Sequence, residues 1–146
     1  MLNRDFEVLT TTGALDLTKK GVFAGSPLTN TEAGFTLAKG KVVFVGLSYN
    51  YYSDLKNDVT GGEWFADSGK VGIVKIGQVT IANEEDMKVF DDTKTYHVND
   101  ALYVDANGLL TNDASVKDTT NKNFVGTVVA VEAGNKSLTV FVNCLN

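Results

Sequence analysis

The chain has few of the residues from which catalytic and metal sites are usually built. Its 146 residues include one histidine, one cysteine and one proline. One histidine and one cysteine cannot supply the four ligands of a conventional structural zinc site, which excludes zinc. The cysteine, Cys144, lies near the end of an apolar strand and cannot form an internal disulfide, so we expect a buried structural residue.

The single histidine, His97, lies in a polar segment just before a strand. No serine nucleophile elbow and no cysteine partner stand beside it in the sequence, although partners distant in the sequence remain open. We interpret His97 as a turn or surface residue. We predict that the chain is not an enzyme, has no catalytic residue and binds no cofactor.

Positively charged residues are also scarce. The formal net charge is −5, and one arginine, Arg4, with twelve scattered lysines forms no basic stripe that could neutralise phosphates. The sequence therefore disfavours a nucleic-acid partner. The acidic clusters at 84–86 and 91–92 lack the alternating spacing and the glycine of a calcium loop, so we interpret them as solvated faces and turns, with no metal site.

Long apolar runs are absent as well. No stretch approaches the roughly 18 apolar residues of a membrane-spanning helix. Residues 1–6 lack the apolar run of a signal peptide. We therefore expect a soluble protein that is synthesised in the cytoplasm and has no membrane partner.

What the chain does contain is a series of strand patterns joined by turn residues. The longest pattern covers 71–81, and its internal glycines, Gly72 and Gly77, suggest bulges or sharp bends. Asn107-Gly108 predicts a two-residue hairpin turn between strands. The other predicted strands cover 42–47, 101–105, 109–111, 124–131 and 138–144. The best helical candidate is short, at 83–90, with Asn83 as its N-cap.

These patterns predict a mostly β fold, a small bent β-barrel or β-sandwich with an extended or irregular N-terminal segment. Glycine and threonine interrupt the apolar residues of the first 40 positions. We therefore expect residues 1–40 to be an irregular N-terminal arm or surface segment, and residues 41–146 to be the barrel or sandwich domain.

Four pieces in chain order also carry a resemblance to a known family. They are the glycine-bent strand at 71–81, the hairpin at 98–111, the strand that begins Phe124-Val125-Gly126, and the closing strand at 138–142. Together they resemble the small β-domain of tailed-bacteriophage capsid decoration (cement) proteins. The resemblance implies a non-enzymatic virion protein that binds the outside of the capsid and stabilises it at junctions of major capsid subunits. It also implies the major capsid protein as partner and a possible homo-oligomer.

Two groups of apolar residues are candidates for contact with a capsid or another partner. One lies in the expected arm, and the other is an aromatic cluster beside a glycine-rich loop, for which core, protein interface and a glycan platform, in that order, are the alternatives. The candidates are Phe6, Leu9, Leu15, Leu17, Phe23, Tyr51, Tyr52, Trp64 and Phe65. The alternatives to a decoration protein are another virion interaction module, such as a head-fibre base or a tail or baseplate protein, and a glycan-binding module.

Overall fold

The computed structural model describes residues 2–4, 9–14, 25–40, 46–48, 70–84, 88–120, 122–134 and 136–144. Within these residues the fold is mostly β, with a single 3₁₀ turn, η1 (Ala114–Val116), as its only helical element. The strands are β1 (Leu2–Arg4), β2 (Leu9–Ala14), β3 (Pro27–Thr31), β4 (Gly34–Leu37), β5 (Gly46–Ser48), β6 (Lys70–Ala82), β7 (Ala101–Val104), β8 (Leu110–Thr111), β9 (Phe124–Val131) and β10 (Ser137–Asn143). The pairing between strands is antiparallel, which confirms the mostly β prediction.

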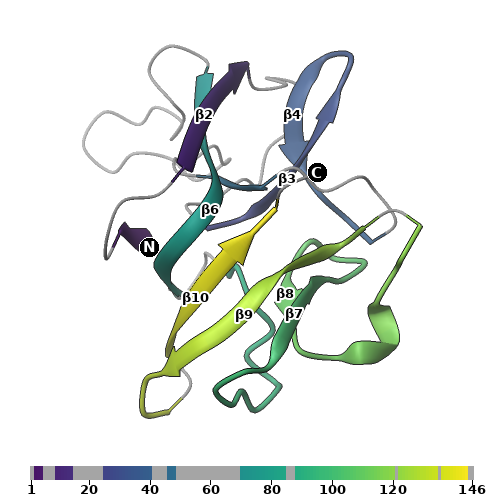
Figure 1. The fold of residues 1–146 in the computed structure, drawn as a ribbon. Coiled ribbons are helices and arrows are strands. Elements are labelled where there is room, and N and C mark those ends of the chain that lie inside the picture. The colour runs from purple at the N-terminus through teal and green to yellow at the C-terminus, as the bar shows by residue number, and fades with distance from the viewer. Residues whose placement is uncertain are drawn as a thin grey trace.

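The long strand β6 is shared by two antiparallel sheets (Figure 1). Ile76 pairs with Leu9 of β2 on one side and with Asn143 of β10 on the other. β2 and β1 therefore follow one edge of β6, and β5 and β10 follow the opposite edge. The strand order runs β4-β3-β5-β6-β10-β9-β7-β8, with β1 and β2 beside β6.

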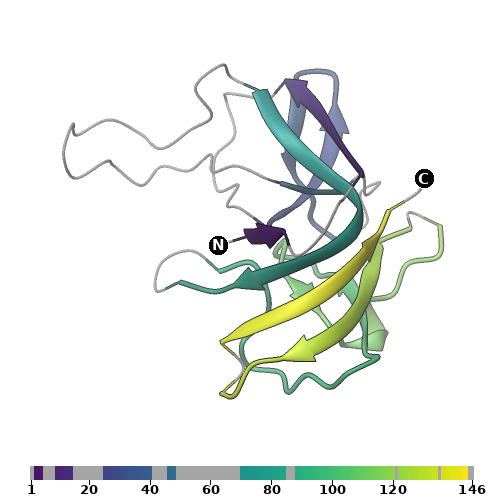
Figure 2. The ribbon, with the colours of Figure 1, turned by 60° about the vertical axis from the view of Figure 1, so that its left-hand side comes forward.

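The predicted bend of the long strand lies at Gly77. This residue has a φ of 135°, which favours glycine, and the pairing with β2 shifts by one residue next to it, between Leu9 and Thr10. Figure 2 shows β6 curving strongly as it passes from one sheet to the other. Gly72, by contrast, pairs with Thr12 in regular register, so the bulge suggested there was wrong.

The predicted strands of the last third are confirmed, but the first turn differs from the prediction. A two-residue type I′ turn needs positive φ at both central residues, whereas here only Gly108 has it, at 83°. The Asp105 carboxylate accepts hydrogen bonds from the backbone N–H groups of Asn107 (2.8 Å) and Leu109 (2.9 Å). This side chain stabilises a longer turn, in which Asp105 N–H donates to the Leu109 carbonyl at 2.9 Å.

Part of the expected N-terminal arm belongs to the sheets. β1 and β2 pair with β6, and the β3–β4 hairpin joins β6 through β5. Leu28 and Ala38 are buried, so the expectation of an irregular segment was wrong for these strands. Of the strand predicted at 42–47, β5 contains the last two residues, and 41–45 lie outside the described residues. The domain boundary at residue 40 stays a prediction.

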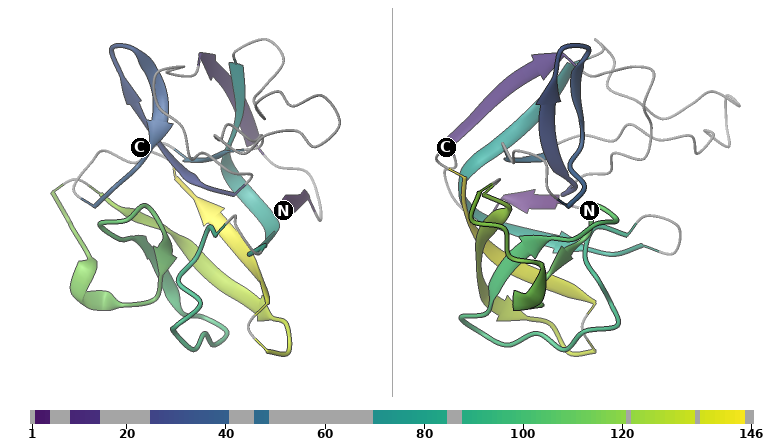
Figure 3. Two further views of the ribbon diagram at one scale, coloured as in Figure 1. Left: turned by 180° about the vertical axis from the view of Figure 1, so that it is seen from behind. Right: turned by 90° about the vertical axis from the view of Figure 1, so that its right-hand side faces the viewer.

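The two ends of the strand order approach each other without pairing. Gly40 N–H, just after β4, donates to the Asp105 carbonyl at the end of β7, with an N···O distance of 2.7 Å. A Cβ at Gly108 would lie 2.7 Å from a Leu37 methyl carbon and 2.8 Å from the Ala38 carbonyl oxygen. We call these contacts between 37–40 and 105–108 the closing contact. Viewed from behind, the β3–β4 hairpin lies above the β7–β8 pair (Figure 3). Among the described strands no pairing closes a barrel.

The described ends of the segment expected to be a helix, 83–84 and 88–90, are not helical, so the prediction was wrong there, and 85–87 lie outside the described residues. The Asn83 side-chain carbonyl accepts from the backbone N–H groups of Val89 (2.8 Å) and Phe90 (3.2 Å), and its amide donates to the Phe90 carbonyl at 2.8 Å. These partners are six and seven residues away, so Asn83 joins the ends of the connection and does not cap a helical turn. Phe90 is thereby placed in the core, where it bridges to Leu110.

The core lies between the inner side of the β6–β10–β9–β7 sheet and the residues that flank β7 in the sequence, Val89, Phe90, Tyr96 and Leu110. Every second residue of β10 points inward, as the buried Leu138, Val140 and Val142 show. From the opposite side, the rings of Phe90 and Tyr96 meet edge to face with centroids 5.6 Å apart. Burying this apolar surface supplies most of the favourable free energy of folding for the β6–β10–β9–β7 sheet.

Candidate functional site

Most of the predicted contact residues lie outside the described part of the chain. This holds for Phe6, Leu15, Leu17, Phe23, Tyr51, Tyr52, Trp64 and Phe65. Leu9 is described through its backbone, which pairs with Ile76 at the start of β2. Their role as partner contacts stays a prediction.

His97 and Cys144 occupy the surroundings that the sequence indicated. The His97 side chain is 74% exposed in a turn, and its Nδ1 lies 3.8 Å from an Asp100 carboxylate oxygen. The Asp100 carboxylate accepts hydrogen bonds from the Asn112 amide and from the His97 backbone N–H, both at 2.8 Å. These bonds lower the pKa of Asp100, and the bond from Asn112 has the larger effect. Cys144 is buried, its thiol donates to the Val125 carbonyl at 3.5 Å, and burial raises its pKa.

Acidic side chains between 91 and 120 stabilise turns. Asp91 accepts from the Thr93 backbone and hydroxyl, and Asp118 from the Thr120 backbone. Asp113 accepts hydrogen bonds from Ser115, which lower its pKa to about 2. The interpretation of 91–92 as a turn is confirmed. Within the described ranges, no group of three or more His, Cys, Asp or Glu side chains is placed to hold a metal ion.

A shallow cavity lies beside the closing contact. It measures about 480 Å³ and is bounded by Gly40, Val104 and Ala106 on one side and by 115–119 on the other. Asn123 holds its wall, because its amide donates to the carbonyls of Val104 (3.0 Å) and Val116 (2.8 Å). The lining combines apolar groups with two charged side chains and gives no specific ligand chemistry.

The most distinctive surface is the outer side of the β6–β10–β9–β7 sheet. The registers align one row of four residues across it, Gln78, Phe141, Thr127 and Ala101, and a second row of three, Thr80, Thr139 and Ala130. The segments 76–82, 101–104, 124–131 and 137–143 contain no charged residue. We call this surface the neutral face: Gln78, Thr80, Ala101, Phe124, Thr127, Val129, Ala130, Thr139 and Phe141.

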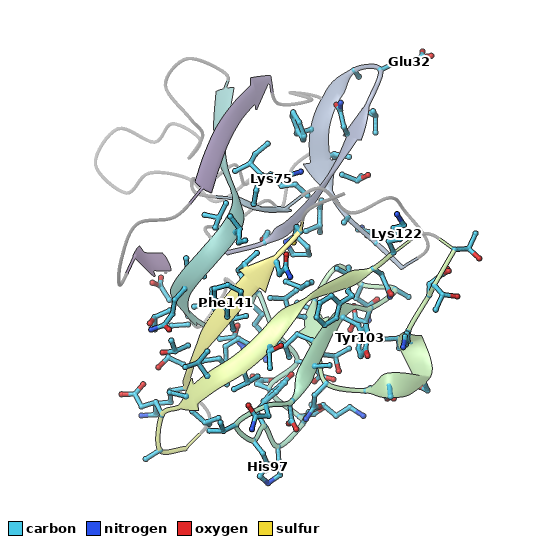
Figure 4. The ribbon with its side chains drawn as sticks, in the orientation of Figure 1. Glu32, Lys75, His97, Tyr103, Lys122 and Phe141 are labelled. Carbon is cyan, nitrogen blue, oxygen red and sulfur yellow. The ribbon has the colours of Figure 1, made fainter. Side chains whose placement is uncertain are left out.

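Large apolar side chains are exposed on the neutral face. Phe124, Val129 and Phe141 are each 38% exposed. Phe124 packs edge to face on Tyr103 of β7, with ring centroids 5.9 Å apart. Figure 4 shows Phe141 and Tyr103 on either side of β9. The hydroxyls of Thr80 and Thr139 hydrogen-bond each other at 3.1 Å, so the polar groups of this pair are satisfied within the face.

Charged residues lie at both ends of β9, at the border of the neutral face. Lys122 precedes β9, and Glu132 and Lys136 lie in the β9–β10 turn, all of them exposed. An uncharged, partly apolar centre with a charged rim is typical of protein interfaces. Sequence reasoning missed this surface, although the absence of charge at the outward positions of the last two strands is visible in the sequence. What the sequence did not reveal is the register that joins those positions into one face.

Comparisons with known proteins assign no family. No protein-family model matches the chain, and neither the curated proteins nor the solved structures include a significant match. In the part of the chain that the structure describes, no helix is long and apolar enough to cross a membrane.

Proposed function

We propose that the chain is a capsid decoration protein of a tailed bacteriophage, bound to the outside of the head. In this proposal it contacts the major capsid protein, performs no catalysis and stabilises junctions between capsid subunits. Its body is a bent sheet of the barrel or sandwich type.

The observation that carries the proposal is the arrangement of the four resembling pieces. They correspond to β6, to β7–β8, to β9 and to β10, which form one continuous antiparallel layer. Their order in space supports the resemblance more strongly than isolated strand patterns do, because unrelated patterns need not pair with one another.

The physical construction also suits a protein that must resist deformation. β6 joins both sheets through its pairing with β2 and β10, and the closing contact links 37–40 to 105–108. The carboxylates of Asp91, Asp105, Asp113 and Asp118 accept backbone hydrogen bonds that hold the long connections. A rigid body loses little conformational entropy on docking, and docking at many equivalent positions multiplies modest contacts.

The experiment is a count of copies per particle. Particles of the phage that encodes the chain are purified, and the ratio of this chain to the major capsid protein is measured by quantitative mass spectrometry. A decoration protein is present in hundreds of copies, because it follows the capsid lattice. About a dozen copies would identify a tail, baseplate or fibre component, and absence from the particle would reject both.

A further inference from the structure

We propose that the neutral face is the surface that docks on the capsid, and that its partner is an uncharged patch of apolar and hydroxyl side chains on the major capsid protein. This inference rests on the proposed function and adds the contact surface and the chemistry of the partner. Phe141, in the middle of the first row, is the central anchor.

The charge distribution determines the kind of partner. The chain carries a net charge of −5, yet the four strand segments of the neutral face carry none. A charged partner surface would lose its hydration against this face and find no opposite charge, which costs free energy. The patch that covers the face must therefore be uncharged at its centre, and the charged rim residues Lys122, Glu132 and Lys136 stay in contact with water.

The exposed aromatic residues determine where the contact is strongest. Two aromatic rings, Phe124 and Phe141, and one valine, Val129, account for three of the four large apolar side chains that are exposed among the described residues. The fourth, Val98, lies in the 88–100 connection beside Asn99, whose N–H donates to the Val128 carbonyl of β9 at 2.8 Å. Aromatic side chains near the centre of an interface contribute most of its binding energy.

The size of the face argues against a second copy as its occupant. Four strands spaced about 4.8 Å apart, with about seven residues at 3.4 Å each in the longer ones, cover about 400 Å². A stable complex of two free proteins buries roughly 800 Å² per partner. Two copies would also bring together chains that each carry a charge of −5. A capsid lattice can hold such a small contact, because it presents many sites and allows each copy further contacts.

The test is binding of the purified chain to heads that lack it, measured by co-sedimentation. Phe141→Lys places a charge at the centre of the neutral face, and Ala130→Lys places one at an exposed position of the second row. The matched control is Asn30→Lys, which places the same charge at an exposed strand position of β3, outside the face. Thermal unfolding shows whether each variant is folded. If Phe141→Lys does not fold, Ala130→Lys alone tests the effect of a charge on binding.

We expect Phe141→Lys and Ala130→Lys to weaken binding at least tenfold, and Asn30→Lys to bind like the unchanged chain. We also expect binding of the unchanged chain to vary less than threefold between 50 and 500 mM NaCl, because the contact contains no ion pairs. Unchanged binding by folded Ala130→Lys and Phe141→Lys, or a larger fall with salt, would overturn the neutral face as the docking surface and leave the decoration function standing. An unchanged chain that binds no heads would overturn both. A stable dimer in light scattering that dissociates in Ala130→Lys would identify a second copy as the occupant and overturn the capsid contact.

Discussion

Replacing Gly108 by alanine should destabilise the fold more than any other single glycine-to-alanine change in a turn of the described chain. Gly108 has a φ of 83°, and the added Cβ would lie 2.7 Å from a Leu37 methyl carbon and 2.8 Å from the Ala38 carbonyl oxygen. The substitution therefore strains the backbone and also separates the two sides of the closing contact. Gly134→Ala is the matched control, because Gly134 has a similar φ of 80° and no atom within 4 Å of the added carbon.

The two contributions can be separated by comparing these variants. A non-glycine residue in the left-handed region costs about 1 kcal/mol, which applies to both positions. Forcing an extra methyl group into a packed contact costs about 1–3 kcal/mol, which applies to Gly108 alone. We expect Gly108→Ala to lower the free energy of unfolding by about 2–4 kcal/mol and Gly134→Ala by about 1 kcal/mol.

Urea denaturation followed by circular dichroism and tryptophan fluorescence measures both values. For a chain of this size the slope is about 1.5 kcal/mol per molar urea, so Gly108→Ala should lower the midpoint by about 1.3–2.7 M. Equal midpoints for the two variants would refute the reasoning, because they would show that the closing contact contributes nothing beyond backbone strain.

Three further predictions concern buried and acidic groups. Asn123→Ala removes two hydrogen bonds to the carbonyls of Val104 and Val116 and one from the Asp118 backbone N–H. It should lower the free energy of unfolding by about 3 kcal/mol in the same urea assay. A loss below 1 kcal/mol would contradict the assigned bonds. Because burial raises its pKa, the Cys144 thiol should react with a thiol reagent at pH 8 only when urea unfolds the chain, and rapid labelling of the folded chain would refute its burial. Asp113 should titrate near pH 2 by carboxyl NMR. Its stabilising contribution should be present above pH 4 and lost as the pH falls towards 2. Ser115→Ala should raise the pKa of Asp113, and an unchanged pKa would contradict the proposed cause.

The sequence predicted the strands of residues 70–143 because their signals are local. Apolar and polar residues alternate along β10, and turn residues flank each strand. β1 and β2 were missed because they pair with β6 across more than 50 residues, and short strands broken by threonine and glycine carry little signal of their own. Long-range pairing thus supplied what local propensity did not.

The failed helix shows how one side chain changes a local prediction. Asn83 begins a segment with the composition of a helix N-terminus, yet its amide bonds the backbone of Val89 and Phe90, and Phe90 is buried in the core. The energy gained by burying this ring outweighs the weak propensity of a short helix. The neutral face failed to emerge for a related reason, since Gln78, Phe141 and Thr127 become neighbours only through the register of β6, β10 and β9.

The most direct test of the whole account is a cryo-electron microscopy reconstruction of heads with and without the chain. We expect the difference density to lie on the outside of the capsid, over junctions between major capsid subunits, with the neutral face and Phe141 turned towards the shell. Density located only at the tail or fibres, or a bound chain whose neutral face is turned towards solvent, would contradict it.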